Sequence, residues 1–183
     1  MSFFQKLLLF LGLPLYALDQ ATKWWIVLNF APPWSADRHE QVVVEGFFNL
    51  VRVHNQGVAF GLGNGTAWAP VVFLLMPVAA VTLIRVLWKK GVFAPPVSQI
   101  AAALLLTGIA GNLTDRLTQG FFLDELSGGT LWQRLSAGYV VDFLDFTIPL
   151  VNYRWPSFNV ADSCICVAAG LLFLSGLREP KKG

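Results

Sequence analysis

The sequence is poor in charge, and this shortage excludes several classes of protein. Only 13% of the 183 residues are Asp, Glu, Lys or Arg, whereas 55% are hydrophobic. Soluble domains carry about a quarter charged residues, so the composition disfavours a soluble protein. The formal net charge of +2 is also too small for a nucleic-acid-binding surface, and we expect no nucleic-acid partner.

Cysteine and histidine are equally scarce. Cys164 and Cys166 are the only cysteines and lie inside an apolar run, so we interpret them as small buried hydrophobic residues rather than a disulfide or zinc framework. His39 and His54 have no acidic or sulfur ligands around them at metal spacing, and no Ser–His or Cys–His catalytic set competes for the chemistry. We therefore expect neither a metal nor a cofactor.

Long apolar segments dominate what is present. A bilayer core of about 30 Å needs roughly 20 mostly apolar helical residues. Suitable segments run over about 6–28, 66–88, 97–117 and 157–177. The first resembles a signal peptide but lacks a clear cleavage site, so we interpret it as a retained span. We predict a single integral membrane domain over residues 1–183, all-α, with four transmembrane helices.

Basic residues flank these predicted spans unequally. One side collects Lys6, Arg85, Lys89, Lys90, Arg178, Lys181 and Lys182. An excess of Lys and Arg marks the cytoplasmic side, so we predict that both termini are cytoplasmic. The two longer loops, about 29–65 and 118–156, then lie on the outer side.

The outer loops contain strand-like stretches. Gln41–Val53 and Tyr139–Tyr153 are rich in β-branched and aromatic residues, which predicts strands that pair into a small extracytoplasmic sheet or cradle. Most tryptophans fall near the predicted outer interface, as in an aromatic belt. They are Trp24, Trp25, Trp34, Trp68, Trp132 and Trp155.

An Asn-x-x-Asp pattern occurs at the outer end of the third span and again at the outer start of the fourth. The two copies are Asn112/Asp115 and Asn159/Asp162. Two carboxylates within hydrogen-bond reach share a proton and titrate as a unit. Such a pair can activate water and protonate a leaving amide. We therefore predict that Asp115 and Asp162 form a catalytic pair, with Asp162 as the base and Asp115 as the acid.

Structural interpretations of both aspartates remain open. Asn159 could cap the fourth helix, where the carboxylate of Asp162 also suits the positive end of the helix dipole. Asp115 could simply pair with Arg116 at the end of its helix.

The remaining acids rank lower as catalytic candidates. Asp142 and Asp145 alternate with apolar residues in the second loop, which favours solvated or hydrogen-bonded loop positions. Asp19 and Lys23 are four residues apart, a spacing that predicts an intrahelical ion pair. A structural or substrate-positioning role for this pair is nearly as well supported.

Two other classes of protein also accommodate intramembrane acids. A proton-coupled transporter could use Asp19, Asp115 and Asp162 as a relay. The gathering of two of these acids at one interface, rather than along a path across the membrane, disfavours that alternative. A structural scaffold would leave the acids and asparagines unexplained.

Four motifs, taken in order along the chain, resemble those of the lipoprotein signal peptidases, or signal peptidase II family. Residues 19–23 (DQATK) look like its first-helix motif, and residues 53–61 (VHNQGVAFG) are similar to its Asn-x-Gly-x-Ala-Phe motif. Residues 108–116 (GIAGNLTDR) resemble its Asn-x-x-Asp-Arg motif, and residues 158–162 (FNVAD) its Phe-Asn-x-Ala-Asp motif. The resemblance covers essentially the whole chain.

The resemblance implies an aspartic endopeptidase of the bacterial inner membrane, with its active site at the extracytoplasmic face. Its substrates would be prolipoproteins whose cysteine carries diacylglycerol, cut just before that cysteine. We expect membrane lipid as a further partner, and a monomer. By motif position, Asp115 and Asp162 would be catalytic. Supporting or substrate-binding residues would be Asp19, Lys23, Asn55, Gly57, Gly108, Asn112, Arg116, Asn159 and Ala161.

One segment departs from the family pattern. Residues 118–138 are longer than the short link that the family usually has there. The sequence leaves open whether this insertion is a lid, a partner surface or a neutral addition.

Overall fold

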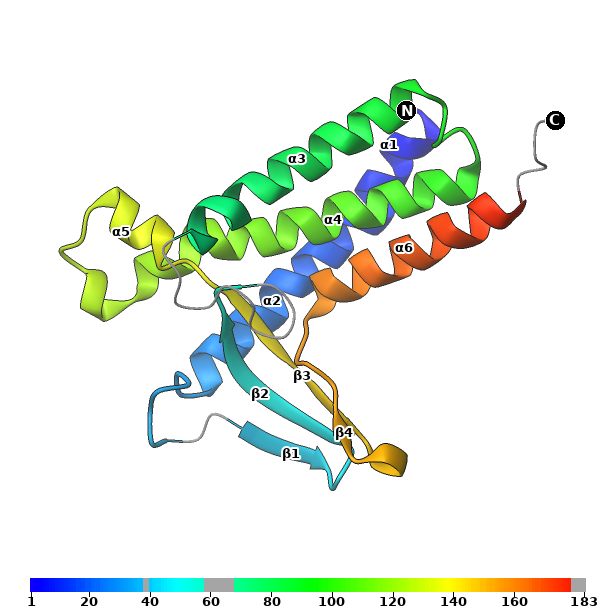
Figure 1. The fold of residues 1–183 in the computed structure, drawn as a ribbon. Helices are drawn as coiled ribbons and strands as arrows, with labels where there is room; N and C mark the ends of the chain where they lie inside the picture. Colours follow the sequence, from blue (N-terminus) through cyan, green and yellow to red (C-terminus); the bar gives the residue numbers. More distant parts are fainter. Residues whose placement is uncertain (38–39, 58–67, 179–183) are drawn as a thin grey trace.

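The computed structural model describes residues 1–37, 40–57 and 68–178. Figure 1 shows a bundle of long helices with a small sheet attached beside the start of α6. Helix α1 begins and α6 ends at the same end of the bundle. The predicted start of the second span, at 66–67, and the motif residues 58–61 lie outside the described part of the chain.

Three helices confirm three of the predicted spans. They are α3 (Ala69–Lys89), α4 (Pro96–Thr118) and α6 (Val160–Arg178). The helical segments Ala69–Lys89, Pro96–Phe122 and Val160–Leu177 are each long and apolar enough to cross a membrane by length and composition. Proline at the start of α3 and of α4 suits the first helical turn, where backbone N–H groups have no helical partner.

The predicted first span is helical, but it is not among these three membrane-length apolar helices. Its helix is divided into α1 (Phe3–Leu7), a π-helical turn η1 (Leu8–Gly12) and α2 (Leu13–Asn29). Helix α2 also carries the buried charged residues Asp19 and Lys23. The interruption and the charges explain why this segment differs from the other three.

The predicted small sheet is confirmed and has four antiparallel strands in the order β1-β2-β3-β4. Gln41–Val53 divides into β1 (Glu40–Val44) and β2 (Phe48–Asn55). Gly46 separates them in a turn at φ +67°, a conformation that glycine adopts without strain. The second stretch forms the long β3 (Val140–Ile148), then η5 (Pro149–Val151) and the short β4 (Tyr153–Arg154).

The segment between α4 and β3 is ordered into short helical turns. It comprises η3 (Gln119–Phe122), η4 (Asp124–Leu126) and α5 (Leu131–Ser136). Thr130 caps α5 by accepting a bond from the backbone of Gln133, whose side chain accepts one in return from the Thr130 N–H. Reciprocal capping of this kind satisfies two backbone donors at the start of a helix.

Small residues let α4 and α6 approach closely. Ala101, Leu104, Cys164 and Ala168 form a buried cluster between them. Gly108 lies at the tightest point, because a Cβ there would lie only 2.5 Å from the carbonyl oxygen of Ala161. This packing brings the outer half of α4 against the start of α6, where both Asn-x-x-Asp patterns are found.

Candidate active site

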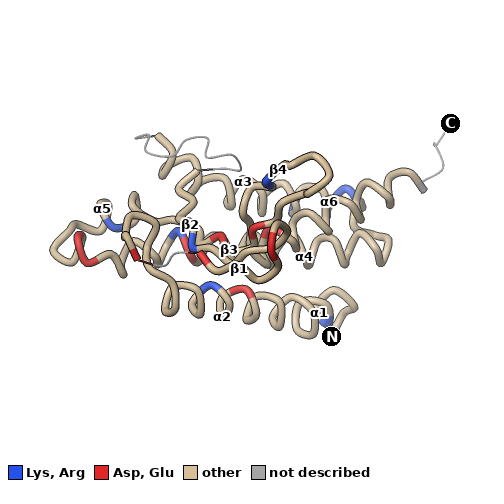
Figure 2. The backbone as a smooth tube through the Cα atoms, turned by 90° about the horizontal axis from the view of Figure 1, so that it is seen from below, with Lys and Arg blue, Asp and Glu red and all other residues tan. Residues whose placement is uncertain are grey.

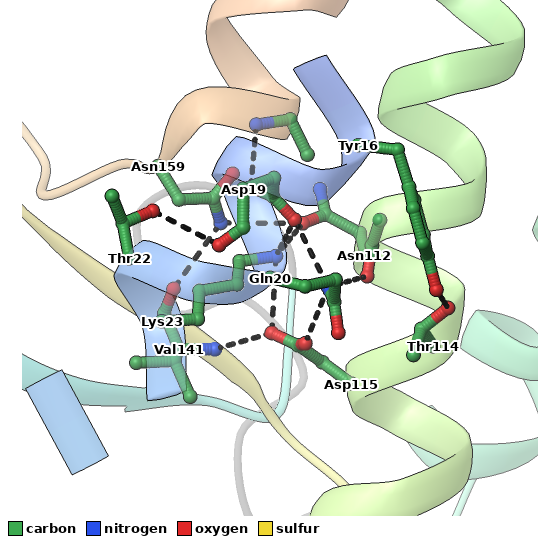
Figure 3. Close-up of polar contacts among 12 residues, drawn as sticks. Tyr16, Asp19, Gln20, Thr22, Lys23, Asn112, Thr114, Asp115, Val141 and Asn159 are labelled. Atoms are coloured by element: carbon green, nitrogen blue, oxygen red, sulfur yellow. Dashed lines mark hydrogen bonds and ion pairs between the residues drawn. The ribbon is translucent and has the colours of Figure 1, made fainter. Parts of the chain in front are cut away.

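A buried lysine lies between two buried aspartates where α2 meets α4. The ammonium of Lys23 is 2.9 Å from Oδ2 of Asp19 and 3.0 Å from Oδ2 of Asp115. It also donates to Oδ1 of Asn112 at 3.0 Å (Figure 3). The predicted ion pair between Asp19 and Lys23 is therefore confirmed, and Lys23 extends it to a second helix. Because all three charged side chains are at most 1% exposed, each depends on its partners for stabilisation.

The carboxylate of Asp115 is occupied by structural contacts. Its Oδ2 accepts the backbone N–H of Val141 at 3.0 Å, in addition to the contact with Lys23. Its Oδ1 accepts a bond from the amide of Gln20 at 3.2 Å. Among the described residues its ionic partner is Lys23, rather than the neighbouring Arg116. Asp115 thereby fixes the start of β3 against α4.

Asp19 makes the corresponding connection to α6. Its Oδ1 accepts the backbone N–H of Ala161 at 2.8 Å, which is one of the unpaired donors at the start of a helix. Gly111 leaves room for this carboxylate, because a Cβ there would lie 2.6 Å from Oδ2 of Asp19. Three predicted site residues thus lie together where α2, α4 and α6 meet. They are Asp19, Asn112 and Ala161.

Asp162 and Asn159 form a reciprocal cap at the start of α6. The N–H of Asp162 donates to Oδ1 of Asn159 at 2.9 Å, and the N–H of Asn159 donates to Oδ2 of Asp162 at 3.2 Å. The capping interpretation of Asn159 is therefore confirmed. Asn112 holds the other carboxylate oxygen of Asp162 from α4, donating from Nδ2 at 2.7 Å.

Asp142 lies in strand β3 and is only 2% exposed. Of the two predicted alternatives, solvated or hydrogen-bonded, the structure therefore supports the hydrogen-bonded one. Oδ1 of Asp142 accepts from Nδ2 of Asn159 at 2.7 Å, and its Oδ2 accepts from Nδ2 of Asn55 at 2.9 Å. Burial, followed by the nearby charge of Asp162, raises the pKa of Asp142 to about 7. A carboxyl group of this kind holds a proton close to neutral pH.

Asp145, the other acid of β3, has a different environment. Its carboxylate accepts two bonds from the guanidinium of Arg154, at 2.8 and 2.7 Å, and one from Asn49 at 3.1 Å. Burial alone would raise the pKa of Asp145, but these bonds outweigh it and hold the pKa below its ordinary value. Its hydrogen-bonded state agrees with the prediction, and the contacts identify it as a brace between strands.

Two cavities meet at Asp162. One of about 260 Å³ is lined by Asn55, Asp142, Trp155, Asp162, Ile165 and Cys166, together with residues 156–158. The other, of about 200 Å³, is lined by Asn55, Gly57, Phe73, Met76, Asn112, Arg116, Val140 and Asp162. Asp142 and Asp162 share the first cavity, whereas Asp115 lines neither of them. Space for a substrate group and water therefore adjoins Asp142 and Asp162.

Arg116 lines the second of these cavities, and Asn55 lines both. The guanidinium of Arg116 donates to the carbonyl of Gly57 at 2.8 Å and lies over the ring of Phe73 at 4.8 Å. Asn55 accepts the N–H of Gly57 at 2.9 Å, so its amide nitrogen is directed toward Asp142. The predicted support residues Asn55, Gly57 and Arg116 are thus brought together.

The histidine of β2 is not placed as an acid or base. Burial, and then the charge of Arg52, lowers the pKa of His54 to about 3, so the ring is neutral at physiological pH. It stacks on Tyr139 with ring centroids 3.6 Å apart. A search of the described residues for three or more neighbouring His, Cys, Asp or Glu side chains that could hold a metal ion found none.

Comparison with known sequences places these motifs among signal peptidases. A family model described as signal peptidase (SPase) II matches residues 11–178. The lipoprotein signal peptidase of Shewanella loihica is 34% identical over 168 residues, covering 91% of this chain and 84% of that protein. The lipoprotein signal peptidase of Syntrophotalea carbinolica is 34% identical over 175 residues, covering 95% and 92%.

Comparison with solved structures identifies the same kind of fold. One bacterial membrane enzyme matches with a TM-score of 0.71 over 96% of this chain and 93% of its own, at 24% identity. A second bacterial membrane enzyme matches with a TM-score of 0.68 over 94% of each chain. The helical body and its attached sheet are therefore the fold of a membrane enzyme.

Proposed function

This chain belongs to the signal peptidase II family, and we propose that it is a protease of the aspartic type with Asp142 and Asp162 as its catalytic pair. Its function is the removal of signal peptides from prolipoproteins, as the family model and the similar lipoprotein signal peptidases indicate. We further infer that the substrate cysteine carries diacylglycerol and that the peptide bond just before it is cut.

The observation that carries the choice of catalytic pair is the shared cavity. Asp142 and Asp162 both line it. The side chain of Asn159 donates to the carboxylate of Asp142 and accepts the backbone N–H of Asp162. Asp162 keeps the role expected from its motif. Asp115 is assigned a positioning role instead, because Lys23, Gln20 and the Val141 N–H occupy its oxygens.

The proposed chemistry uses the two carboxyl groups in opposite protonation states. Asp142, with its pKa of about 7, begins protonated and donates its proton to the oxygen of the scissile carbonyl. Ionised Asp162 takes a proton from water, and the resulting hydroxide attacks the carbonyl carbon to give a tetrahedral diol. Collapse breaks the C–N bond as Asp162 protonates the leaving nitrogen and Asp142 recovers a proton from the diol.

The remaining predicted site residues hold this pair in place. The amide of Asn112 donates to Asp162 and accepts from Lys23. It therefore links the ion pairs of Lys23 to the proposed catalytic carboxylate. The bond from Val141 to Asp115 fixes the residue immediately before Asp142. Preorganised carboxylates avoid reorganisation during the reaction.

We also infer how the enzyme lies in the bilayer. The helix over residues 3–29 acts as a fourth span, since its charged residues Asp19 and Lys23 neutralise each other inside the bundle. The basic residues near the ends of the helices favour cytoplasmic termini, which puts the catalytic pair at the extracytoplasmic face of the bacterial inner membrane. Residues 1–183 then act as one domain and as a monomer, in contact with membrane lipid.

Cleavage by single-residue variants tests the catalytic pair. Purified enzyme in lipid bilayers is incubated with a diacylglyceryl-modified prolipoprotein, and the shortened product is measured. Asp142→Asn and Asp162→Asn should each reduce the rate by at least about 10²–10⁴-fold, the usual contribution of a general acid or base. Asp145→Asn, in the same strand, is the matched control and should keep most of the activity.

The variant Asp115→Asn separates the two possible pairs. We expect it to lower thermal stability and to leave measurable cleavage, because Asp115 holds β3 without facing the cavity. If folded Asp115→Asn is inactive while Asp142→Asn still cleaves, the catalytic pair is Asp115 and Asp162, as the sequence motifs predicted. If every variant cleaves normally, the aspartic mechanism itself is refuted.

A further inference from the structure

Residues 119–138, between α4 and β3, leave the helical bundle and return to it at nearly the same place. We call this segment the excursion. Gly120 lies against the backbone carbonyl of Arg134, and Gly138 lies against that of Arg116, so closely that a Cβ at either glycine would collide with the carbonyl oxygen. The two limbs of the segment are therefore in backbone contact at its base. Glycine is required where two backbones approach this closely.

Internal contacts also hold the excursion in shape. The guanidinium of Arg134 donates to the carbonyl oxygens of Ser127 and Gly129 and lies over the ring of Phe121 at 5.5 Å. Leu123 packs against a buried hydrophobic cluster that includes Ile26 of α2 and Phe143 of β3. These contacts give the excursion a defined conformation.

Large apolar side chains on this element face outward. Phe122 is 58% exposed, Leu131 66% and Trp132 53%, and Phe121 is also exposed at 39%. These four fall within twelve residues of chain, from 121 to 132. Clustered exposed aromatic and aliphatic groups indicate an interaction surface.

This surface is continuous with the part of the bundle that faces lipid. The helix that begins at Pro96 continues directly into the turn Gln119–Phe122, and together they form one of the segments that can cross a membrane by length and composition. At 1.5 Å per residue, the 23 residues of α4 span about 34 Å, which exceeds a bilayer core of about 30 Å. The end of α4 and the following turn therefore emerge at the membrane interface, where Phe122 contacts Trp24 of α2 edge-on, with ring centroids 4.8 Å apart.

Charge is arranged as an interfacial element requires. The acidic residues Asp124 and Glu125 form the first turn of η4, and Figure 2 shows acidic positions at the end of this excursion that is farthest from the other helices. Arg134 is already engaged by carbonyl groups and the Phe121 ring. The acidic end of the excursion can therefore be hydrated. Among its described residues, however, no basic side chain is available to bind an anionic lipid headgroup.

We propose that the excursion is a membrane anchor, whose side chains Phe122, Leu131 and Trp132 insert into the interfacial region of the outer leaflet. Apolar groups of interfacial elements lie about 5–10 Å deep at the headgroup–acyl boundary, and tryptophan favours that level. The two acids make attraction to anionic lipid unfavourable, so the contact is with neutral or zwitterionic lipid. This anchor is independent of the proposed catalytic pair.

Photocrosslinking to lipid tests the anchor. Benzoylphenylalanine replaces Trp132 or Leu131 in the full chain, which is placed in bilayers of phosphatidylcholine and irradiated. Peptides that carry lipid are then measured by mass spectrometry. Glu125 is the matched control within the same excursion, and the exposed Leu75 of α3 is the lipid-facing reference.

We expect lipid adducts at both anchor positions to be comparable to those at Leu75 and about tenfold or more above those at Glu125, as interfacial insertion requires. Adducts at Trp132 and Leu131 no more abundant than at Glu125, with Leu75 labelled normally, would refute the anchor. Crosslinks from these positions to a second copy of the chain would refute it as well. Replacing a third of the lipid with phosphatidylglycerol should not raise the yield, and an increase would contradict the neutral-lipid assignment.

Discussion

The side chain of Asn159 donates a hydrogen bond from Nδ2 to Oδ1 of Asp142, with 2.7 Å between the two atoms. The same side chain accepts the backbone N–H of Asp162 at 2.9 Å. Asn159 is fully buried, so water does not compete for these bonds. One residue therefore sets the position of a carboxyl group on a strand relative to another on a helix.

Replacing this residue should uncouple the two carboxyl groups. Asn159→Ala removes the bond to Asp142 and the cap of α6, and a displacement of about 1 Å at a reacting group can lower the rate about a hundredfold. The matched control is Asn49→Ala, which removes a comparable bond to Asp145 and should keep its cleavage rate. Equal losses in the two variants, measured as kcat at saturating substrate, would contradict the bridging role of Asn159.

Close packing of α4 against α6 gives a second prediction. Gly108→Ala places a methyl group 2.5 Å from the carbonyl oxygen of Ala161 and 2.6 Å from Cγ1 of Ile165, which forces the helices apart. Overpacking of this kind costs about 1–3 kcal/mol. Gly170→Ala is the matched control, since its new Cβ would meet nothing within 4 Å. Thermal unfolding in detergent should show a lower Tm for the first variant alone, and an unchanged Tm there would refute the close contact.

The buried ion cluster gives a third prediction. Lys23→Met leaves Asp19 and Asp115 buried without their shared cation, and breaking a buried ion pair by removing one partner costs about 3–5 kcal/mol. Lys89→Met, at the exposed end of α3, is the control and should unfold like the wild type.

A double variant checks the cause of this instability. Adding Asp115→Asn to Lys23→Met removes one of the uncompensated charges, so the double variant should be more stable than Lys23→Met alone. A double variant whose losses simply add would show that the lysine and Asp115 do not interact.

Much of the architecture follows from local patterns in the sequence. Apolar runs of membrane length predict α3, α4 and α6, because a lipid environment requires continuous apolar helices. Spacing of four residues predicts the pair of Asp19 and Lys23, and spacing of three predicts the cap formed by Asn159. In each case the interacting groups lie within one turn of the same helix.

Contacts between distant segments could not be predicted in this way. Lys23 of α2 forms an ion pair with Asp115 of α4, and no spacing in the sequence predicts a contact between these two helices. Asp142 and Asp145 have similar apolar neighbours in β3, yet the structure makes one a wall of the cavity and the other a partner of Arg154. Successive side chains of a strand alternate between faces, but the sequence does not say what covers each face.

The proton of Asp142 gives a fourth prediction, for the pH dependence of cleavage. As the proposed acid, Asp142 must be protonated, so kcat/KM should fall as pH rises above its pKa of about 7. The bond from Asn55 favours the ionised form and lowers this pKa. Asn55→Ala should therefore move the alkaline limb of the profile to higher pH. A limb that stays in place, or moves to lower pH, would contradict the assignment of Asp142 as the acid.

The two acids of β3 give opposite pH dependences of stability. An unfolded Asp titrates near pH 3.9. The raised pKa of Asp142 means that the folded chain holds its proton between about pH 4 and 7, so its contribution to stability is present below this window and is lost as pH rises through it. The lowered pKa of Asp145 has the reverse effect, and its contribution is lost as pH falls through the folded-state value.

Difference curves of Tm against pH isolate each group. Asparagine does not ionise, so Asp142→Asn should gain stability relative to wild type as pH rises from about 4 to about 7. The Tm of Asp145→Asn should instead be closest to that of the wild type at acidic pH and should fall below it at neutral pH. The reason is that this variant lacks the ionised partner of Arg154. Difference curves with the same slope would show that burial near Asp162 and pairing with Arg154 do not distinguish these two carboxyl groups.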